Sequence, residues 1–152
     1  MDVVYLDIDD IKEICHPFAV AYFNKKEDPI PAFSVRAVPL LDSALHLPRQ
    51  AFGGHELYPT LPKKAAMLFY GIIQNHPFEN GNKRIATASL LVFLYINDYL
   101  LNVSQDDLAE KAIWIARAGE RKMKKDILLP ELEKWIENHI KKRDGKEFRY
   151  KG

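Results

Sequence analysis

Hydrophobic residues in the middle of the chain recur at spacings of three and four, which is the period of an α-helix. They predict a helix over 60–76, which Thr60 is suited to start and which must end before Pro77. A second helix is predicted from about 82 to about 98, and its stretch 85–96 is apolar nearly all round. Such a stretch is typical of a helix buried at the centre of a bundle. We therefore expect an all-α fold in which a polar loop joins two central helices.

Weaker helical patterns flank this central pair. An N-terminal helix is expected from Asp7 or Asp9, with a kink or break at Pro17, because a proline inside a helix costs ~3 kcal/mol. Its apolar face comprises Ile8, Ile11, Cys15, Phe18 and Tyr22. Further helices are expected from Pro39 to about Leu47, from Ser104 to a C-cap at Gly119, and from Pro130 onwards.

The segments between these helices lack periodicity. Residues 25–38 are expected to form a loop, and residues 49–59 an exposed flap with Gly53 and Gly54 at its centre. The only signals for strands lie at 3–6 and in the flap. We expect one domain over 1–142, fraying from Lys141 into a charged tail over 143–152 that is disordered.

Composition narrows the functional classes. The 152 residues are 47% hydrophobic, which is enough for a core, and 22 Lys and Arg against 21 Asp and Glu give a net charge of +1. This balance argues against a nucleic-acid partner. The single cysteine, Cys15, cannot form an internal disulfide, and no apolar run reaches the ~18 residues of a membrane span. We therefore expect a cytoplasmic protein that does not bind a membrane.

The polar loop 76–84, which reads HPFENGNKR and is called the motif loop below, has the character of a phosphate site. It leads into a helix start, where free N–H groups and the helix dipole favour an anion, and Gly81 lets the backbone approach a ligand closely. Lys83 and Arg84 oppose that dipole unless an anion is bound. At the other end of the loop, His76 can accept a proton as a general base, and Phe78 is expected to anchor the loop in the core.

The pattern His-x-Phe-x-x-Gly-Asn-Lys-Arg resembles the signature of the Fic/Doc family. The similarity extends through segments 40–45, 52–54, 57–61 and 64–66, and more weakly through 5–7. The resemblance implies the Fic-type helical bundle and the transfer of part of a nucleoside triphosphate, such as ATP, to a hydroxyl of a target protein. By that resemblance, His76 is the general base, Gly81 and Asn82 hold phosphate oxygens, and Lys83 and Arg84 neutralise phosphate charge.

The metal position departs from the family pattern. The family usually has Asp or Glu as its Mg²⁺ ligand where this chain has Asn80. Because Mg²⁺ prefers carboxylate oxygen, either the metal binds more weakly, or Glu79 helps to hold it, or the site is less active. We favour weaker metal binding, because the rest of the motif loop is intact.

Lys83 and Thr87 are similar to the Doc branch, the toxin half of a toxin–antitoxin pair, rather than to the adenylylating branch, which usually has glycine and a second arginine there. The resemblance implies phosphoryl transfer to elongation factor Tu. It also implies an antitoxin in trans, a Phd-like protein with a disordered segment that folds on binding. AMP transfer by a Fic-type adenylyltransferase is the alternative, and a non-catalytic nucleotide- or protein-binding module is a second one.

The flap has a proposed partner as well. In the family such a segment aligns the backbone of a target protein, which here implies contacts from Phe52, Gly53, Gly54 and Tyr58. The sequence leaves open whether Arg36 and Arg49 form surface ion pairs or face the cleft.

Overall fold

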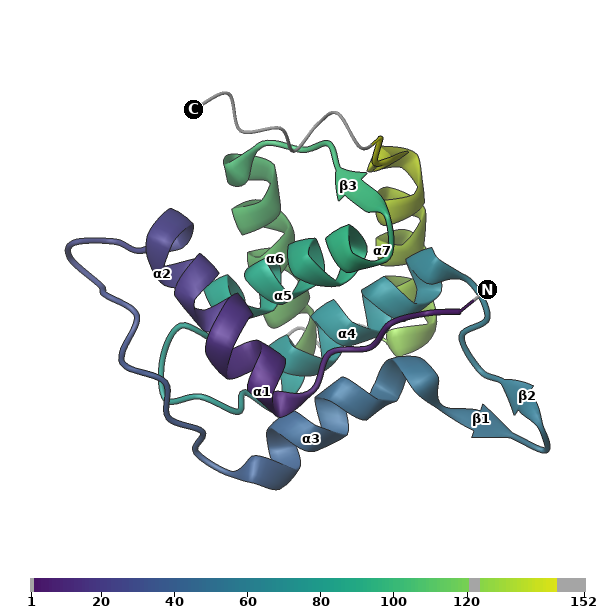
Figure 1. The fold of residues 1–152 in the computed structure, drawn as a ribbon, viewed down its shortest axis with the longest axis horizontal. Coiled ribbons are helices and arrows are strands. Elements are labelled where there is room, and N and C mark those ends of the chain that lie inside the picture. The colour runs from purple at the N-terminus through teal and green to yellow at the C-terminus, as the bar shows by residue number, and fades with distance from the viewer. Residues whose placement is uncertain (1, 121–123, 145–152) are drawn as a thin grey trace.

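The computed structural model describes residues 2–120 and 124–144, and helices make up most of the regular structure there (Figure 1). The helical elements are α1 (Ile8–Asp10), the π-helical segment η1 (Ile11–Cys15), α2 (His16–Phe23), α3 (Val38–His46), the 3₁₀ turn η2 (Leu47–Arg49), α4 (Leu61–Asn75), α5 (Asn82–Ile96), α6 (Gln105–Glu120) and α7 (Lys125–His139). The strands are β1 (Ala51–Phe52), β2 (His55–Glu56), β3 (Tyr99–Leu101) and β4 (Ile140–Lys142), in two small antiparallel pairs. The all-α prediction is confirmed.

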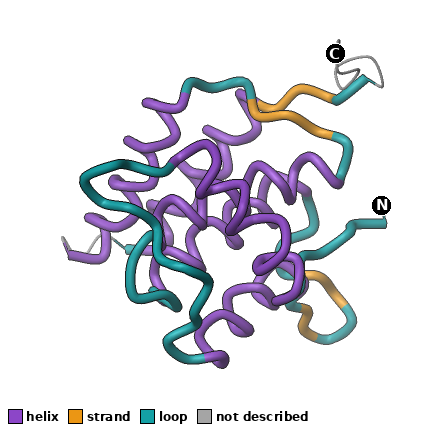
Figure 2. The backbone as a smooth tube through the Cα atoms, turned by 60° about the vertical axis from the view of Figure 1, so that its left-hand side comes forward, coloured by secondary structure: helices purple, strands orange, loops and turns teal. Residues whose placement is uncertain are grey.

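The two central helices are α4 and α5, as the hydrophobic pattern predicted. Thr60 caps α4 by accepting a hydrogen bond from the Lys63 N–H. The two helices pack against each other, with α3 and α7 against α4, α2 against α5, and α6 against both (Figures 1 and 2). Phe69, Ile72, Leu90 and Leu94 are completely buried between these layers. The core therefore holds both ends of the motif loop in fixed positions.

The N-terminal helix differs from the expected broken helix. The predicted break at Pro17 does not occur, because the π-helical η1 precedes it and Pro17 falls in the first turn of α2, where its missing N–H costs little. The His16 N–H reaches five residues back, to the Ile11 carbonyl. The wider turn also shifts the buried face to Ile11, Cys15 and Ala19, so that Tyr22 is exposed.

Residues 3–6 do not form the strand that their sequence suggested. The segment is extended, and its backbone hydrogen-bonds to a side chain instead of a neighbouring strand. The Val4 N–H donates to Asn97 Oδ1 at 2.8 Å, and Asn97 Nδ2 donates to the Val4 carbonyl at 2.9 Å. One asparagine at the end of α5 thus replaces the pairing partner of a strand.

The last helix begins earlier than predicted. It starts at Lys125, and Pro130 lies inside it rather than at its start. A proline in a helix interior removes one hydrogen bond and its ring crowds the carbonyl four residues before it, and the burial of Leu128, Leu132 and Ile136 on one face offsets that loss. At the C-terminal end of α6, the helix continues through the predicted cap at Gly119 to Glu120.

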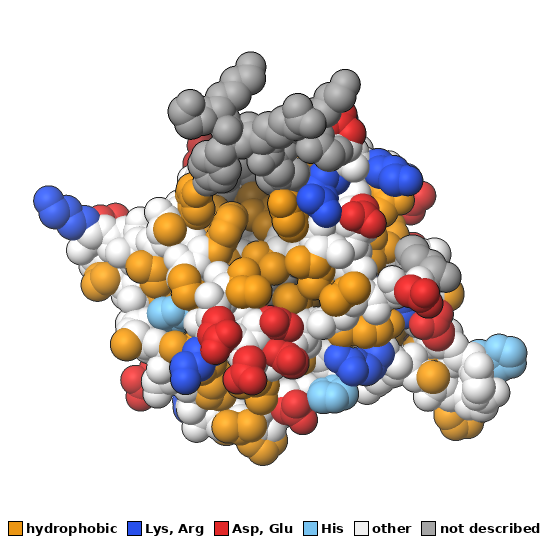
Figure 3. All heavy atoms as spheres, in the orientation of Figure 1, with side chains coloured by type: hydrophobic (Ala, Val, Ile, Leu, Met, Phe, Trp, Pro, Cys, Tyr) orange, Lys and Arg blue, Asp and Glu red, His pale blue; other side chains and the backbone are white. Residues whose placement is uncertain are grey.

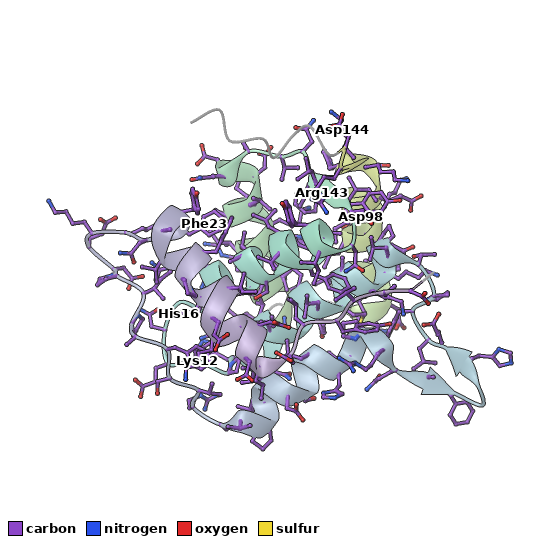
Figure 4. All side chains as sticks on the ribbon, in the orientation of Figure 1. Lys12, His16, Phe23, Asp98, Arg143 and Asp144 are labelled. Atoms are coloured by element: carbon purple, nitrogen blue, oxygen red, sulfur yellow. The ribbon has the colours of Figure 1, made fainter. Side chains whose placement is uncertain are left out.

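The chain after α7 forms a strand that pairs with β3, which the charge pattern did not indicate. β4 lies antiparallel to β3, with Leu100 opposite Lys141, and Arg143 Nη2 donates to Asp98 Oδ1 at 3.1 Å (Figure 4). The expectation of fraying from Lys141 is therefore wrong for 141–143. Residues 145–152, which make up most of the predicted disordered tail, lie outside the described residues.

The flap is a β-hairpin formed by β1 and β2, with Gly53 and Gly54 at positive φ in its tip. It projects from the helical body (Figures 1 and 3). Residues 25–37 form a long loop between α2 and α3, as predicted. Among the described helices, none has the length and apolar character that crossing a bilayer requires.

Burial raises the pKa of the Cys15 thiol to about 12, with a smaller rise from Asp10 and an opposing hydrogen bond from Ser89, as expected for a core cysteine.

Candidate active site

His76 ends α4 in a left-handed backbone conformation, with φ 50° and ψ 54°. A residue with a side chain rarely adopts this conformation, so neighbouring groups must hold it there. Arg36 does so: its Nη2 donates to the His76 carbonyl at 2.9 Å, and its backbone N–H donates to the Pro77 carbonyl at 2.7 Å. The strained turn leaves the His76 imidazole exposed. Arg36 therefore faces the motif loop.

Asn82 holds the motif loop closed. Its side chain, 5% exposed, donates from Nδ2 to the Phe78 carbonyl at 2.7 Å and accepts at Oδ1 from the Phe78 N–H at 2.9 Å. The same Nδ2 lies 3.3 Å from His76 Nδ1. The family resemblance assigned Asn82 to phosphate oxygens, but its side-chain amide is engaged inside the loop. The structure thus leaves only its backbone N–H for an anion.

Phe78 anchors the centre of the loop. Its side chain is buried and meets the ring of Phe33 edge-on, with centroids 5.8 Å apart. Its backbone forms an isolated antiparallel bridge with Val35. Segment 24–37 therefore lies directly against the motif loop.

The start of α5 has the backbone geometry that an anion cradle requires. Gly81 is the N-cap at φ 82°, and a Cβ there would lie 3.2 Å from the Ile30 side chain, so the position needs glycine for both reasons. The first hydrogen bond of α5 runs from the Ile85 N–H to the Gly81 carbonyl at 2.8 Å. The N–H groups of residues 82–84 precede that bond and lie at the positive end of the helix dipole.

A cavity of about 370 Å³ opens beside this cradle. Its polar side is formed by the motif loop, namely His76 and residues 80–84. The part of its lining that comes from α2 and α6 is more apolar, with Tyr22, Leu108, Ala112 and Ile113 beside Gln105 and Asp106. The volume lies within the range of small-molecule sites, and the division into an anion-binding end and an apolar wall suits a nucleotide.

A carboxylate that sequence reasoning missed also lies in this site. Asp28, on segment 24–37, accepts at Oδ1 from Asn80 Nδ2 at 2.7 Å and at Oδ2 from Arg84 Nη2 at 3.2 Å. Arg84 Nη1 also donates to the Asp28 carbonyl at 2.6 Å. Asp28 is 52 positions from Asn80 in the chain, and no spacing or periodicity pointed to this contact.

The residues available for a metal differ from those expected. Asn80 Oδ1 accepts from the Gly81 N–H at 2.8 Å, and Glu79 lines a separate shallow depression with His16 and Pro31. Among the described residues, no cluster of three or more His, Cys, Asp or Glu side chains could hold a metal by itself. Mg²⁺ usually needs only one or two carboxylates when it shares substrate phosphates, so the carboxylate of Asp28 fits a nucleotide-bound ion.

The structure does not bring the hairpin to this cavity. The hairpin precedes α4 and the motif loop follows it, so about 22 Å of helix separates their attachment points. None of residues 51–58, all of which are described, lines the cavity. Phe52 is 82% exposed and Tyr58 is half-buried. Arg49, at the base of the hairpin, lies over the ring of Tyr5 at 4.6 Å and does not line the cavity.

Comparison with known proteins agrees with this site. The model of the Fic/DOC family matches residues 5–94, which include the hairpin, the motif loop and most of α5. A curated relative, Toxin Doc of Mycolicibacterium smegmatis, is 42% identical over 77 residues. The match covers 50% of this chain and 59% of the relative. No solved structure matches. The length of the family match shows that the chain belongs to the Fic/DOC family.

Proposed function

We propose that this protein is a Doc-like toxin that transfers the γ-phosphoryl group of a nucleoside triphosphate to a hydroxyl of a target protein. The observation that carries the proposal is the 370 Å³ cavity, which brings together His76, the free N–H groups at the start of α5, and the cations Lys83 and Arg84. The proposed target is elongation factor Tu, as the family resemblance implies, so that phosphorylation would block translation.

In the proposed reaction, the phosphates bind the N–H groups of α5 and the two cations, which stabilise the charge spread over the transferred group. His76 accepts the proton of the target hydroxyl as its oxygen forms a bond to the γ-phosphorus. The bond from that phosphorus to the β–γ bridging oxygen breaks, and the nucleoside diphosphate leaves with the electron pair. Mg²⁺ bound with the nucleotide would neutralise phosphate charge, and the carboxylate of Asp28 would hold it, with the side-chain amide of Asn80 beside it.

Thr87 favours phosphoryl transfer over AMP transfer. The adenylylating branch usually carries a second arginine at this position. Here Thr87 is buried and its hydroxyl donates to the Lys83 carbonyl at 2.8 Å, while Lys83 itself is exposed. The positive charge of this site is therefore concentrated at the helix start rather than one turn further along α5.

The donor position of the label separates the two reactions. The protein is incubated with elongation factor Tu and ATP labelled in either the γ or the α phosphate. We expect label on the target only from the γ position. Label arriving only from the α position would replace the proposal with adenylylation. If neither label is transferred while nucleotide still binds, and Asn80→Asp is equally inert, the protein is a non-catalytic module.

We further propose that an antitoxin controls this activity in trans. The mycobacterial relative carries the name Toxin Doc, which supports a partner of this kind. We propose a Phd-like protein with a disordered segment that folds on this chain. Induced expression should stop growth for the wild type but not for His76→Ala, and co-expression of the antitoxin should restore it. If the wild type and His76→Ala arrest growth equally, the proposed chemistry is not the cause of the arrest.

A further inference from the structure

We infer that Asp28 supplies the carboxylate that couples nucleotide binding to a divalent cation, and that it weakens the binding of metal-free polyphosphates to the site. The inference rests on the proposed function, because it concerns the same phosphate cradle. It assigns a role to segment 24–37, which neither the motif nor the hydrophobic pattern marked as functional.

The first argument is the position of Asp28. Its carboxylate contacts both Asn80, where the family usually has the metal ligand, and Arg84, a proposed phosphate ligand. All three residues line the same cavity. The side chain of Asp28 is 55% exposed, whereas that of Arg84 is 16% exposed, so the carboxylate lies on the open side of the pair and can meet an incoming ligand.

The second argument is that the local backbone builds this position. The Asp28 N–H donates to the Lys25 carbonyl at 3.1 Å, which closes a turn. Asn24 Oδ1 accepts from the Ile30 N–H at 2.7 Å, and His16 Nε2 lies 2.7 Å from the Pro31 carbonyl (Figure 4). Segment 24–37 is thus fixed on both sides of Asp28, and the carboxylate is held at the cavity by the fold.

The third argument is charge. With the site empty, Asp28 neutralises Arg84, and a metal-free polyphosphate that reaches Arg84 meets an adjacent carboxylate of like charge. When a nucleotide binds together with Mg²⁺, Arg84 contacts the phosphates. The metal ion then replaces Arg84 as the cation next to Asp28. Mg²⁺ characteristically binds through one or two carboxylates and substrate phosphates, and Asp28 provides one. The carboxylate missing at position 80 is thereby supplied from another segment.

The experiment measures binding of a fluorescent N-methylanthraniloyl derivative of ATP to the purified protein with and without Mg²⁺. We expect Mg²⁺ to tighten binding to the wild type about tenfold. In Asp28→Asn, binding without metal should become about threefold tighter or more, and the gain from Mg²⁺ should fall below about threefold. The matched control is Glu27→Gln, which removes an exposed carboxylate from the same turn, outside the cavity lining, and should behave as wild type.

A relocation variant tests the assignment directly. Asp28→Asn combined with Asn80→Asp returns a carboxylate to the loop position and should restore the gain from Mg²⁺. Mn²⁺ provides an independent readout, because its electron paramagnetic resonance signal reports the free ion. Wild type with nucleotide should bind Mn²⁺ more tightly than Asp28→Asn with nucleotide.

Three results would overturn the inference. If Asp28→Asn keeps the full gain from Mg²⁺, or if Glu27→Gln loses as much of it as Asp28→Asn, Asp28 does not couple metal to nucleotide, and the proposed function still stands. If the wild type binds no nucleotide under either condition, the inference and the proposed function both fail. Circular dichroism melts establish that each variant is folded.

Discussion

The motif loop and the β1–β2 hairpin flank the same helix, α4, and the structure holds them in opposite ways. The motif loop follows the C-terminal end of α4 and is bonded along its length, by Arg36, Asn82 and the Phe78 bridge to Val35. The hairpin precedes the N-terminal end and is tied at its base. Lys64, 1% exposed, donates to Glu56 Oε1 at 3.0 Å and to the Pro48 carbonyl at 3.1 Å.

This difference suggests two different tasks. Chemistry requires reacting groups that are already in position, and the motif loop is fixed by contacts from segment 24–37 and by the side chain of Asn82 within the loop. A surface that meets a macromolecule can instead keep an exposed tip on a firm base, and the hairpin has the exposed Phe52 near its tip and the hydrogen-bonded Lys64 at its base. The variants below test these tasks separately, beginning with the largest expected effect.

His76→Ala should have the largest effect on activity. Loss of the general base should lower phosphoryl transfer about 10³-fold, within the range of 10²–10⁴ typical of such residues, and leave nucleotide affinity unchanged. Transfer from γ-labelled ATP measures the first quantity and fluorescence titration the second. His46→Ala, on the exposed end of α3, is the control and should keep full activity. Comparable losses of activity in both variants would show that His76 has no specific role in the chemistry.

Arg36→Ala should act on the same reaction through the backbone. Without its guanidinium, the left-handed turn at His76 relaxes, and a displacement of about 1 Å in a reacting group can cost about 10²-fold in rate. The loss should appear in kcat rather than in nucleotide affinity. Arg36→Lys should recover part of it, because an ammonium can still donate to the His76 carbonyl. Unchanged kcat in Arg36→Ala would show that the turn holds without this contact.

Glu56→Gln tests the base of the hairpin. It removes the negative charge beside the buried Lys64 ammonium but keeps an oxygen that can accept its hydrogen bond, so only the charge-dependent part of that bond, about 1 kcal/mol, should be lost. Urea unfolding should show a loss of about that size. Glu137→Gln on the exposed side of α7 should change the free energy of unfolding by less than about 0.5 kcal/mol. Equal changes in the free energy of unfolding for the two variants would show that the Lys64–Glu56 contact does not stabilise the hairpin.

Phe52→Ser should have the smallest effect on the protein itself. Because the side chain is 82% exposed, the free energy of unfolding should stay within about 0.5 kcal/mol of wild type. Nucleotide affinity should not change either. If the hairpin contacts the target, the KM for the protein substrate rises at constant kcat. An unchanged KM would show that Phe52 of the hairpin does not contribute to target binding.

The sequence was most informative about features that depend on residues close together in the chain. The run of apolar residues over 85–96 predicted a buried central helix, and Thr60 and Pro77 marked the limits of α4. The cations at the start of α5 and the glycine before them indicated an anion site, which the geometry of Gly81 and the cavity supports. These features depend on neighbours within a few residues, so that local pattern is enough to find them.

The features that the sequence did not reveal depend on distant contacts. Asp28 and Arg36 lie in a segment without periodicity, and their roles arise only when it folds against the motif loop. The β3–β4 pair joins residues about 40 positions apart, and each strand has only three residues, too few for a recognisable alternation. Pro130 misled for another reason, since the buried face of α7 on both sides of it outweighs the cost of a proline inside a helix.

The most direct test of the central claim is calorimetric titration of Mg²⁺-ATP into the wild type, Arg84→Gln and Lys12→Gln. Arg84 lines the cavity at the start of α5, whereas Lys12 is an exposed residue of η1 that lies outside the cavity lining (Figure 4). The two variants lose the same formal charge. If the motif loop is a nucleotide-phosphate site, Arg84→Gln weakens binding about tenfold or more and Lys12→Gln binds as wild type does. Wild-type affinity in Arg84→Gln, or the same loss in both variants, would contradict the claim.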